Sequence, residues 1–207
     1  RVIIGPNGAG KTTLLDLICG RTRASAGSIK FKNDEMTTLP EYQIVRSGIG
    51  RKFQTPSIYE NLSVFQNLEV SFPRGRDVFG ALFFKCTEEV KSRVQSVAEE
   101  IGLADQLEAE AGLLSHGQKQ WLEIGMLLMQ EPKLLLLDEP VAGMTDEETE
   151  RTAELFLTLK GKHSLMVVEH DMSFIRTISE IVTVLCDGSV LAQGTLDQVQ
   201  ADERVIE

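Results

Sequence analysis

The sequence lacks an apolar run long enough to cross a bilayer, and it lacks a signal-peptide pattern at its start. Its uniformly apolar runs, such as Leu134–Leu137, are far shorter than the roughly 20 residues that a membrane-spanning helix needs. We therefore expect a soluble chain in the cytoplasm.

Basic residues are too few for a nucleic-acid surface. The chain has 21 lysines and arginines against 31 acidic residues, which gives a net charge of −10. Because phosphate backbones are bound by clusters of lysine and arginine, we expect no nucleic-acid partner. A single bound nucleotide is compatible with this charge, since one loop of backbone amides can hold it.

Cysteine is scarce, and its three copies show no paired spacing. Cys19, Cys86 and Cys186 lie too far apart in the chain for a zinc site or a redox motif. We interpret all three as buried, reduced thiols.

What is present indicates an α/β domain. A length of 207 residues with 42% apolar residues suffices for one compact domain with a sizeable core. Uniformly apolar segments are typical of parallel strands that are covered on both faces, and helical patterns separate them here. The predicted strands are 1–4, 27–31, 134–137, 165–168, 181–185 and 189–192, and the predicted helices include 11–18, 40–47 and 147–160.

The domain is expected to carry an inserted helical part. Residues 55–130 have a mostly helical pattern, with an amphipathic segment at 88–101 and a further helix that starts at Ser115. Residues 1–54 and 131–207 are then the catalytic core. Because a domain seldom starts on the last residues of a central strand, we also expect further strands before Arg1.

A glycine-rich segment between the first strand and the first helix has the pattern of a phosphate-binding loop. It matches Gly-x-x-x-x-Gly-Lys-Thr from Gly5 to Thr12 in the required strand-loop-helix context. Backbone amides would approach the phosphates, Lys11 would contact the β and γ phosphates, and Thr12 would bind Mg²⁺. The residues expected to bind ATP here are Gly5, Pro6, Asn7, Gly8, Ala9, Gly10, Lys11, Thr12 and Thr13.

Two carboxylates follow the apolar run Leu134–Leu137. In open α/β sheets, ligands bind at the carboxyl ends of the strands, where Asp138 and Glu139 are expected to lie. Asp138 would hold Mg²⁺, and Glu139 would act as general base toward the attacking water. A solvated acidic pair at a strand end is the alternative.

The segment Leu114–Gln118, which reads Leu-Ser-His-Gly-Gln, resembles the signature of the ATP-binding cassette (ABC) family. By itself, Ser115 could simply cap the following helix. The resemblance covers nearly the whole chain and implies a P-loop NTPase fold with a RecA-like core and a mostly parallel sheet. It departs from the usual pattern at His116, where the family has glycine, and at Thr145, where an aspartate is usual.

The resemblance implies further site residues and partners. Gln54 would contact Mg²⁺ and the membrane partner, and His170 would join Glu139 and Lys11 as a catalytic residue at the γ-phosphate. In such proteins the signature of one subunit covers ATP held by another. The signature residues expected to contact that nucleotide are Ser115, Gly117 and Gln118.

The implied assembly is an importer. Its partners would be a second ATP-binding subunit, integral membrane permease subunits and a solute-binding protein outside the membrane, with this chain peripheral on the cytoplasmic face. Three segments resemble the urea-type importer group, namely Gly48–Gln54, Leu114–Glu123 and Pro140–Asp146, so the resemblance implies urea as the expected solute. Alternatives are a branched-chain amino acid importer, a cassette ATPase of DNA maintenance, and a non-catalytic nucleotide-gated scaffold.

Overall fold

The computed structural model describes residues 1–52, 57–73 and 87–206, which divide into two compact units. The first unit comprises 1–54, 133–140 and 156–207, and the second comprises 55–132 and 141–155. We expected all of 131–207 to lie in the core, but 141–155 groups with the helical unit. One reason is a buried hydrogen bond of 2.8 Å from Trp121 Nε1 to Thr152 Oγ1.

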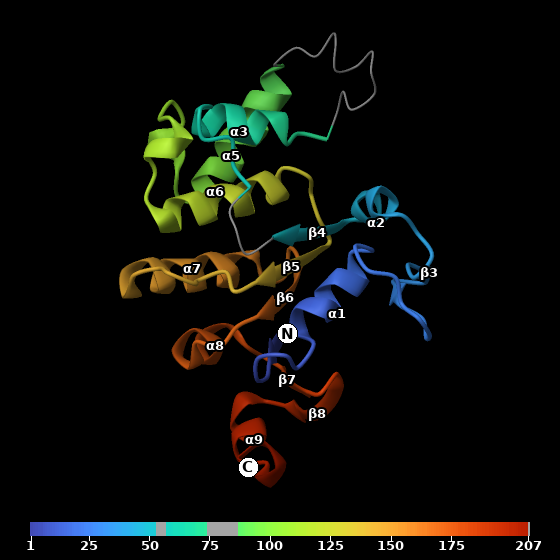
Figure 1. Ribbon diagram of the computed structural model, residues 1–207. Coiled ribbons are helices and arrows are strands. Elements are labelled where there is room, and N and C mark those ends of the chain that lie inside the picture. The colour runs from blue at the N-terminus through green and yellow to red at the C-terminus, as the bar shows by residue number, and fades with distance from the viewer. Residues whose placement is uncertain (53–56, 74–86, 207) are drawn as a thin grey trace. The chain divides into compact units, whose positions relative to one another are not determined.

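A six-stranded sheet forms the centre of the first unit within the described residues (Figure 1). Its order is β4-β5-β6-β1-β7-β8, and every neighbouring pair is parallel except the β7–β8 hairpin. The strands are β1 Val2–Ile4, β4 Ile49–Lys52, β5 Leu134–Asp138, β6 Ser164–Val168, β7 Val182–Cys186 and β8 Ser189–Gly194. The mostly parallel α/β fold expected from the alternating pattern is therefore confirmed.

Helices cover both faces of this sheet, and Figure 1 shows α1 and α8 on opposite sides of it. The helices of this unit are α1 Lys11–Ile18, α2 Glu41–Ser47, α8 Met172–Ile178, α9 Leu196–Gln200 and α10 Glu203–Ile206. The predicted strand 27–31 shrinks to β2 Lys30–Phe31, which pairs only with β3 Asp34–Glu35. Most residues of β1, β5 and β7 are thus removed from water, as their apolar pattern requires, whereas Leu165 and Met166 on β6 are half-buried.

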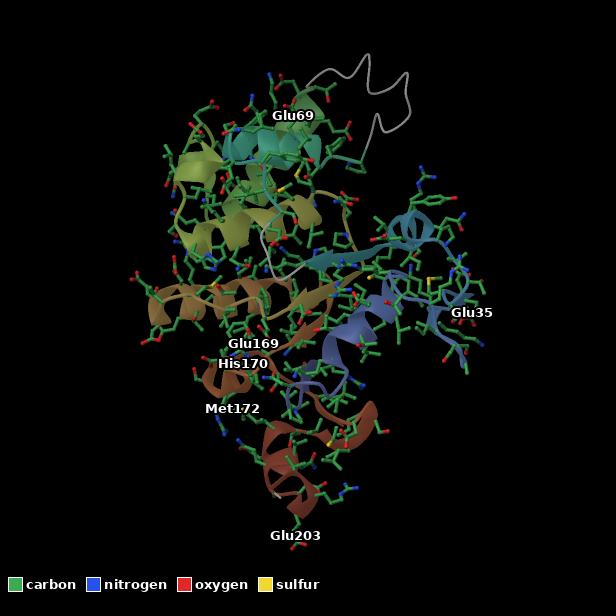
Figure 2. The ribbon with its side chains drawn as sticks, viewed as in Figure 1. Glu35, Glu69, Glu169, His170, Met172 and Glu203 are labelled. Carbon is green, nitrogen blue, oxygen red and sulfur yellow. The ribbon has the colours of Figure 1, made fainter. Side chains whose placement is uncertain are left out.

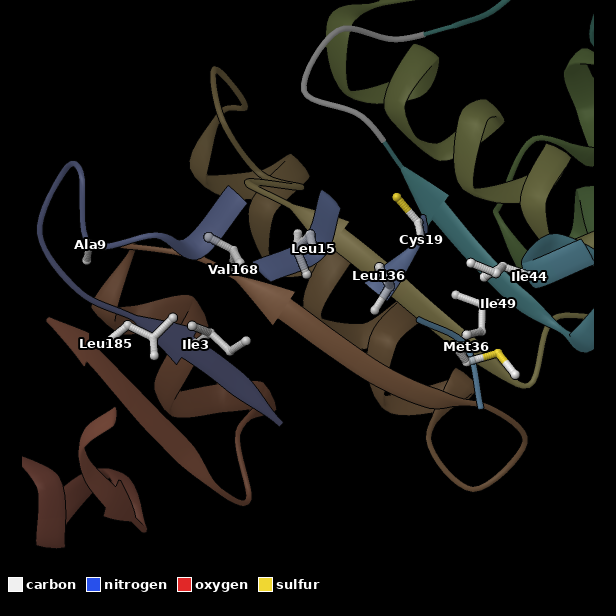
Figure 3. Packing of buried hydrophobic residues seen from close by; sticks show 10 residues of the cluster. All are labelled: Ile3, Ala9, Leu15, Cys19, Met36, Ile44, Ile49, Leu136, Val168 and Leu185. Carbon is white, nitrogen blue, oxygen red and sulfur yellow. The ribbon is translucent and has the colours of Figure 1, made fainter. Parts of the chain in front are cut away.

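The core next to α1 is apolar and closely packed (Figure 3). Leu15 on α1, Leu136 on β5 and Ile3 on β1 belong to one cluster of buried side chains, and each of them is 2% exposed or less. Because this face anchors α1 on the sheet, the loop that precedes α1 starts from a fixed strand and ends on a fixed helix.

The second unit is helical. Its elements are α3 Val64–Val70, α5 Glu88–Glu100, the short 3₁₀ helices Ala104–Gln106 and Ala111–Leu113, α6 His116–Leu128, and the first part of α7 Asp146–Leu159. The amphipathic segment predicted at 88–101 is α5, which buries Val90, Val94 and Val97. No helix among the described residues is long and apolar enough to cross a membrane.

The cysteines agree only in part with the expectation of buried thiols. Cys19 is buried and free, but Cys186 is half-buried at the end of β7. Cys86 lies outside the described residues.

We predict that Leu136→Ala lowers the free energy of unfolding by about 3 kcal/mol, because it leaves a cavity beneath α1. Urea denaturation measures this change. Leu113→Ala is the matched control, since Leu113 is 81% exposed and its truncation should cost less than about 0.5 kcal/mol. Equal losses in the two variants would contradict the packing described here.

Candidate functional site

The loop between β1 and α1 closes on itself through the predicted phosphate-contacting lysine. Lys11 Nζ donates to the carbonyl oxygens of Gly5 at 2.7 Å and Pro6 at 3.0 Å. Gly10 caps α1 in the left-handed region, with φ of 93°, and supplies no side-chain cap. The first amides of α1 therefore have no capping side chain, which is the arrangement that favours an anion at a helix start.

Gly5 shows why this loop cannot carry a side chain at its first position. Its φ is 151°, and a Cβ placed there would lie 2.1 Å from the carbonyl oxygen of Leu185 on β7. The loop thus leaves β1 pressed against the backbone of the neighbouring strand, and only glycine permits this approach.

Asp138 ends β5 as a buried carboxylate, with 1% of the residue exposed. Burial raises the pKa of Asp138, and this effect is opposed by a hydrogen bond from Thr12 and by the Arg51 guanidinium. Thr12 and Asp138, predicted separately as Mg²⁺ ligands, therefore lie close to each other. The Oδ1 atom of Asp138 is buried and has no hydrogen-bond partner among the described residues.

These residues fit a magnesium ion. A hydroxyl and a carboxylate are oxygen donors of the kind that Mg²⁺ prefers, and this cation typically adds only one or two protein ligands to phosphate and water oxygens. Accordingly, no cluster of three or more histidine, cysteine or acidic residues suited to a metal occurs in the described part of the chain. A cation here would also compensate the orphaned Oδ1 atom.

Arg51 is a buried cation that the sequence did not single out. Its guanidinium, on β4, is hydrogen-bonded to the Asp16 carboxylate on α1 and lies 3.9 Å from Asp138 Oδ2. It also contacts Cys19 Sγ at 3.2 Å. The Arg51 side chain is 5% exposed, so this ion pair links the helix that follows the phosphate loop to the strand that carries Asp138.

Glu139 and His170 lie side by side at the ends of two neighbouring strands. Glu139 has φ of 48°, and its amide donates to the Val168 carbonyl at 2.9 Å. Its Oε1 atom is 3.9 Å from His170 Nδ1, and the imidazole is 74% exposed. Figure 2 shows Glu169 and His170 together at the start of α8. A left-handed backbone at a non-glycine residue costs about 1–3 kcal/mol and is found most often at functional sites.

Glu169, next to His170, has a structural role that the sequence did not reveal. Its Oε2 atom accepts from the amides of His170 at 2.8 Å and Asp171 at 3.2 Å. The same oxygen lies 3.7 Å from His170 Nδ1. This buried carboxylate therefore shapes the turn that presents His170.

The signature segment begins α6 in the second unit. Ser115 caps this helix in a reciprocal pair with Gln118, in which the Ser115 hydroxyl accepts from the Gln118 amide and Gln118 Oε1 accepts from the Ser115 amide. His116 Nε2 lies 3.1 Å from the carbonyl oxygen of Ala142. Ser115 therefore does cap this helix. Because its hydroxyl oxygen is the acceptor in the cap, the hydroxyl hydrogen can still be donated to another group.

The structure thus brings several predicted residues together and leaves one undescribed. Thr12 lies close to Asp138, and the Glu139 carboxylate lies 3.9 Å from the His170 ring. Gln54 lies outside the described residues. The roles of all these residues in binding and hydrolysis stay predictions.

A cavity of about 740 Å³ lies elsewhere in the first unit. Its lining includes Arg1, Leu134 and Ser164, at the amino ends of three parallel strands, and none of the predicted site residues. Ligands of open α/β sheets bind at the carboxyl ends, so this cavity is not the candidate site.

Comparison with known proteins agrees with this geometry. Residues 1–142 match the family model described as "ABC transporter". The high-affinity branched-chain amino acid transport ATP-binding protein BraF of Pseudomonas aeruginosa is 34% identical over 213 residues, which cover 99% of this chain and 84% of BraF. The corresponding protein LivG of Escherichia coli is 33% identical with the same coverage.

Solved structures show the same fold. An ATP-binding cassette of an ABC transporter in its ADP conformation superposes with a TM-score of 0.84 at 31% identity, covering 99% of this chain and 85% of that one. A nucleotide-free cassette from an ABC transporter gives 0.82 at 30% identity, covering 100% and 85%.

We predict that Arg51→Met lowers the free energy of unfolding by about 3–5 kcal/mol, because it leaves the buried Asp138 and the partly exposed Asp16 without their cation. Chemical denaturation followed by tryptophan fluorescence checks this. Arg23→Met, at an exposed position, removes the same charge and should change stability by less than about 0.5 kcal/mol. If both variants unfold at the same denaturant concentration, the buried ion pair does not stabilise the fold.

Proposed function

The chain belongs to the ATP-binding proteins of ABC transporters, which hydrolyse ATP with Mg²⁺, and we propose that it drives an importer of the branched-chain amino acid type. The observation that carries the catalytic part is the meeting of Thr12 and Asp138 beside an orphaned carboxylate oxygen. Two motifs more than a hundred residues apart thereby supply one cation site.

In this proposal the first unit holds ATP. The amides of the loop Gly5–Thr13 hold the phosphates, and Lys11 exchanges its present carbonyl partners for phosphate oxygens, which are stronger acceptors. Thr12 and Asp138 hold Mg²⁺, together with Gln54. When bound, the cation would compensate negative charge on the phosphates.

Glu139 and His170 are assigned to the hydrolytic step. Glu139, half-exposed and held by its amide to Val168, accepts a proton from the attacking water. His170, whose ring is mostly exposed, donates to the γ-phosphate and stays next to Glu139. Glu139 directly follows β5, and His170 lies two residues after β6, so the sheet positions both side chains.

The second unit contributes to a partner's nucleotide. Ser115, Gly117 and Gln118 lie in the first turn of α6, where the helix dipole and amides favour an anion. We assign them to ATP held by a second ATP-binding subunit, so that each chain supplies half of two sites. ATP then closes the dimer, and hydrolysis releases it.

The dimer would act on permease subunits from the cytoplasmic face of the membrane, with a solute-binding protein on the opposite side. BraF and LivG are transport proteins for branched-chain amino acids, and their likeness extends over 99% of this chain. The nucleotide-binding subunit does not contact the solute, so its sequence bears on the solute only through likeness.

We predict that Glu139→Gln lowers the rate of ATP hydrolysis by about 10²–10⁴-fold while ATP binding is retained, because the amide cannot accept the proton. Steady-state phosphate release and equilibrium nucleotide binding measure the two properties. Glu180→Gln removes an exposed carboxylate of the same unit and should hydrolyse ATP at the wild-type rate. Undiminished turnover by Glu139→Gln would remove Glu139 from the role of base.

Urea is the second candidate solute. The segments Gly48–Gln54, Leu114–Glu123 and Pro140–Asp146 resemble the urea-type group, whereas BraF and LivG are branched-chain amino acid transport proteins. The two solutes differ in charge and apolar surface, so one permease with its binding protein can discriminate strongly between them.

We predict that leucine, isoleucine or valine stimulates ATP hydrolysis by the complete transporter, whereas urea does not. The measurement uses the full-length protein co-purified with its permease subunits in vesicles, with the solute-binding protein added. Glu139→Gln in the same complex is the control for transport-coupled hydrolysis. Stimulation by urea alone would contradict the amino acid assignment and favour the second candidate.

A further inference from the structure

A carboxylate from the same chain occupies the start of the signature helix. Glu148, in the first turn of α7, accepts a hydrogen bond of 2.8 Å on Oε1 from the Ser115 hydroxyl. The carboxyl group also lies against Gly117, where an added Cβ would be 2.5 Å from Glu148 Cδ. An anionic group therefore already covers the first turn of α6.

Glu148 is held in this position from its own helix. Its Oε2 atom accepts from the Thr145 amide at 3.1 Å, and its amide donates to Thr145 Oγ1 at 3.2 Å. This is the reciprocal arrangement in which the third residue of a helix reaches back to the capping residue. One carboxylate thus bridges the starts of α6 and α7 within the second unit.

The charge of this carboxylate is maintained at neutral pH. Hydrogen bonds from Ser115 above all, and from the Thr145 and Gly117 amides, lower the pKa of Glu148. Its surroundings therefore provide what an incoming phosphate would use, namely a hydroxyl donor, a backbone amide and the positive end of a helix.

We propose that Glu148 is an intrachain placeholder for phosphate, which must leave Ser115 and Gly117 before this signature can cover the ATP of a partner subunit. The inference rests on the proposed function, because it takes the signature to act on a second subunit's nucleotide. A carboxylate and a phosphate repel each other and need the same donors, so they cannot share the first turn of α6. Glu148 thereby raises the ATP concentration needed to close the dimer.

Thr145 fits this device better than the aspartate that is usual there. Both residue types can cap α7. An aspartate, however, would add a further negative charge to a helix turn that already carries Asp146, Glu147 and Glu148, whereas the uncharged threonine hydroxyl accepts a hydrogen bond from the Glu148 amide. The departure from the family pattern is thus linked to the carboxylate at the signature.

The test compares variants of the full-length protein in which Glu139→Gln blocks turnover. Glu148→Gln is added because glutamine still suits the third position of the helix but removes the charge. We expect the ATP concentration at half-maximal dimerisation, followed by light scattering, to fall about five- to tenfold, as expected when a charge-assisted bond becomes neutral. Binding of ATP by the monomer should not change.

Glu147→Gln is the matched control, because Glu147 is the exposed neighbour on the same helix turn. It should dimerise at the same ATP concentration as its parent. Glu148→Asp, which keeps the charge but shortens the side chain by one methylene, should fall between the parent and Glu148→Gln. Thermal unfolding verifies that each variant is folded.

The outcomes separate this inference from the function on which it rests. If the parent dimerises with ATP but Glu148→Gln needs an equal concentration, the placeholder is refuted and the proposed dimer stands. A higher concentration refutes it too, because Glu148 would then position Ser115 for phosphate. If the folded parent binds ATP and does not dimerise, the signature in trans and the placeholder both fail.

Discussion

The buried carboxylate of Asp138 is the constraint on which the arrangement of the first unit depends. It stands at the end of an apolar strand, where an uncompensated charge would cost several kcal/mol. Arg51 and Thr12 compensate part of it and also fix β4 and α1 beside β5. One oxygen of the carboxylate, Asp138 Oδ1, still has no partner among the described residues, and a cation would bind there. Stability and cation binding thus depend on the same group.

Backbone geometry at the ends of β1 and β5 answers to a second constraint, the crowding at the carboxyl edge of the sheet. A parallel sheet brings these carboxyl ends to one edge, so the loops that leave them are crowded. Gly5 resolves the crowding by having no Cβ, and Glu139 resolves it by adopting φ of 48°. The strain at Glu139 is tolerated because its amide is bonded to β6, and the side chain is thereby held next to His170.

Much of the fold could be predicted from the sequence because its signals are local. The apolar runs predicted the strands β5 to β8 to within one or two residues, and the helix at 11–18 was predicted to the residue. Strand β4 was missed, because Gly48–Lys52 contains two glycines and two cations and lacks the apolar run of its neighbours. Its cations are buried at positions that only the tertiary structure defines.

The site divides in the same way. Lys11, Asp138 and Ser115 stand in short motifs, so sequence alone could propose them. Glu148 could not be found in this manner, since 33 residues separate it from Ser115 and its acidic helix turn resembles any solvated one. Only the folded chain brings Glu148 to Ser115, so its effect on the signature helix follows from the fold and not from the motif. A motif predicts which ligand a helix start can bind, whereas the carboxylate already bound there determines how strongly that ligand must compete.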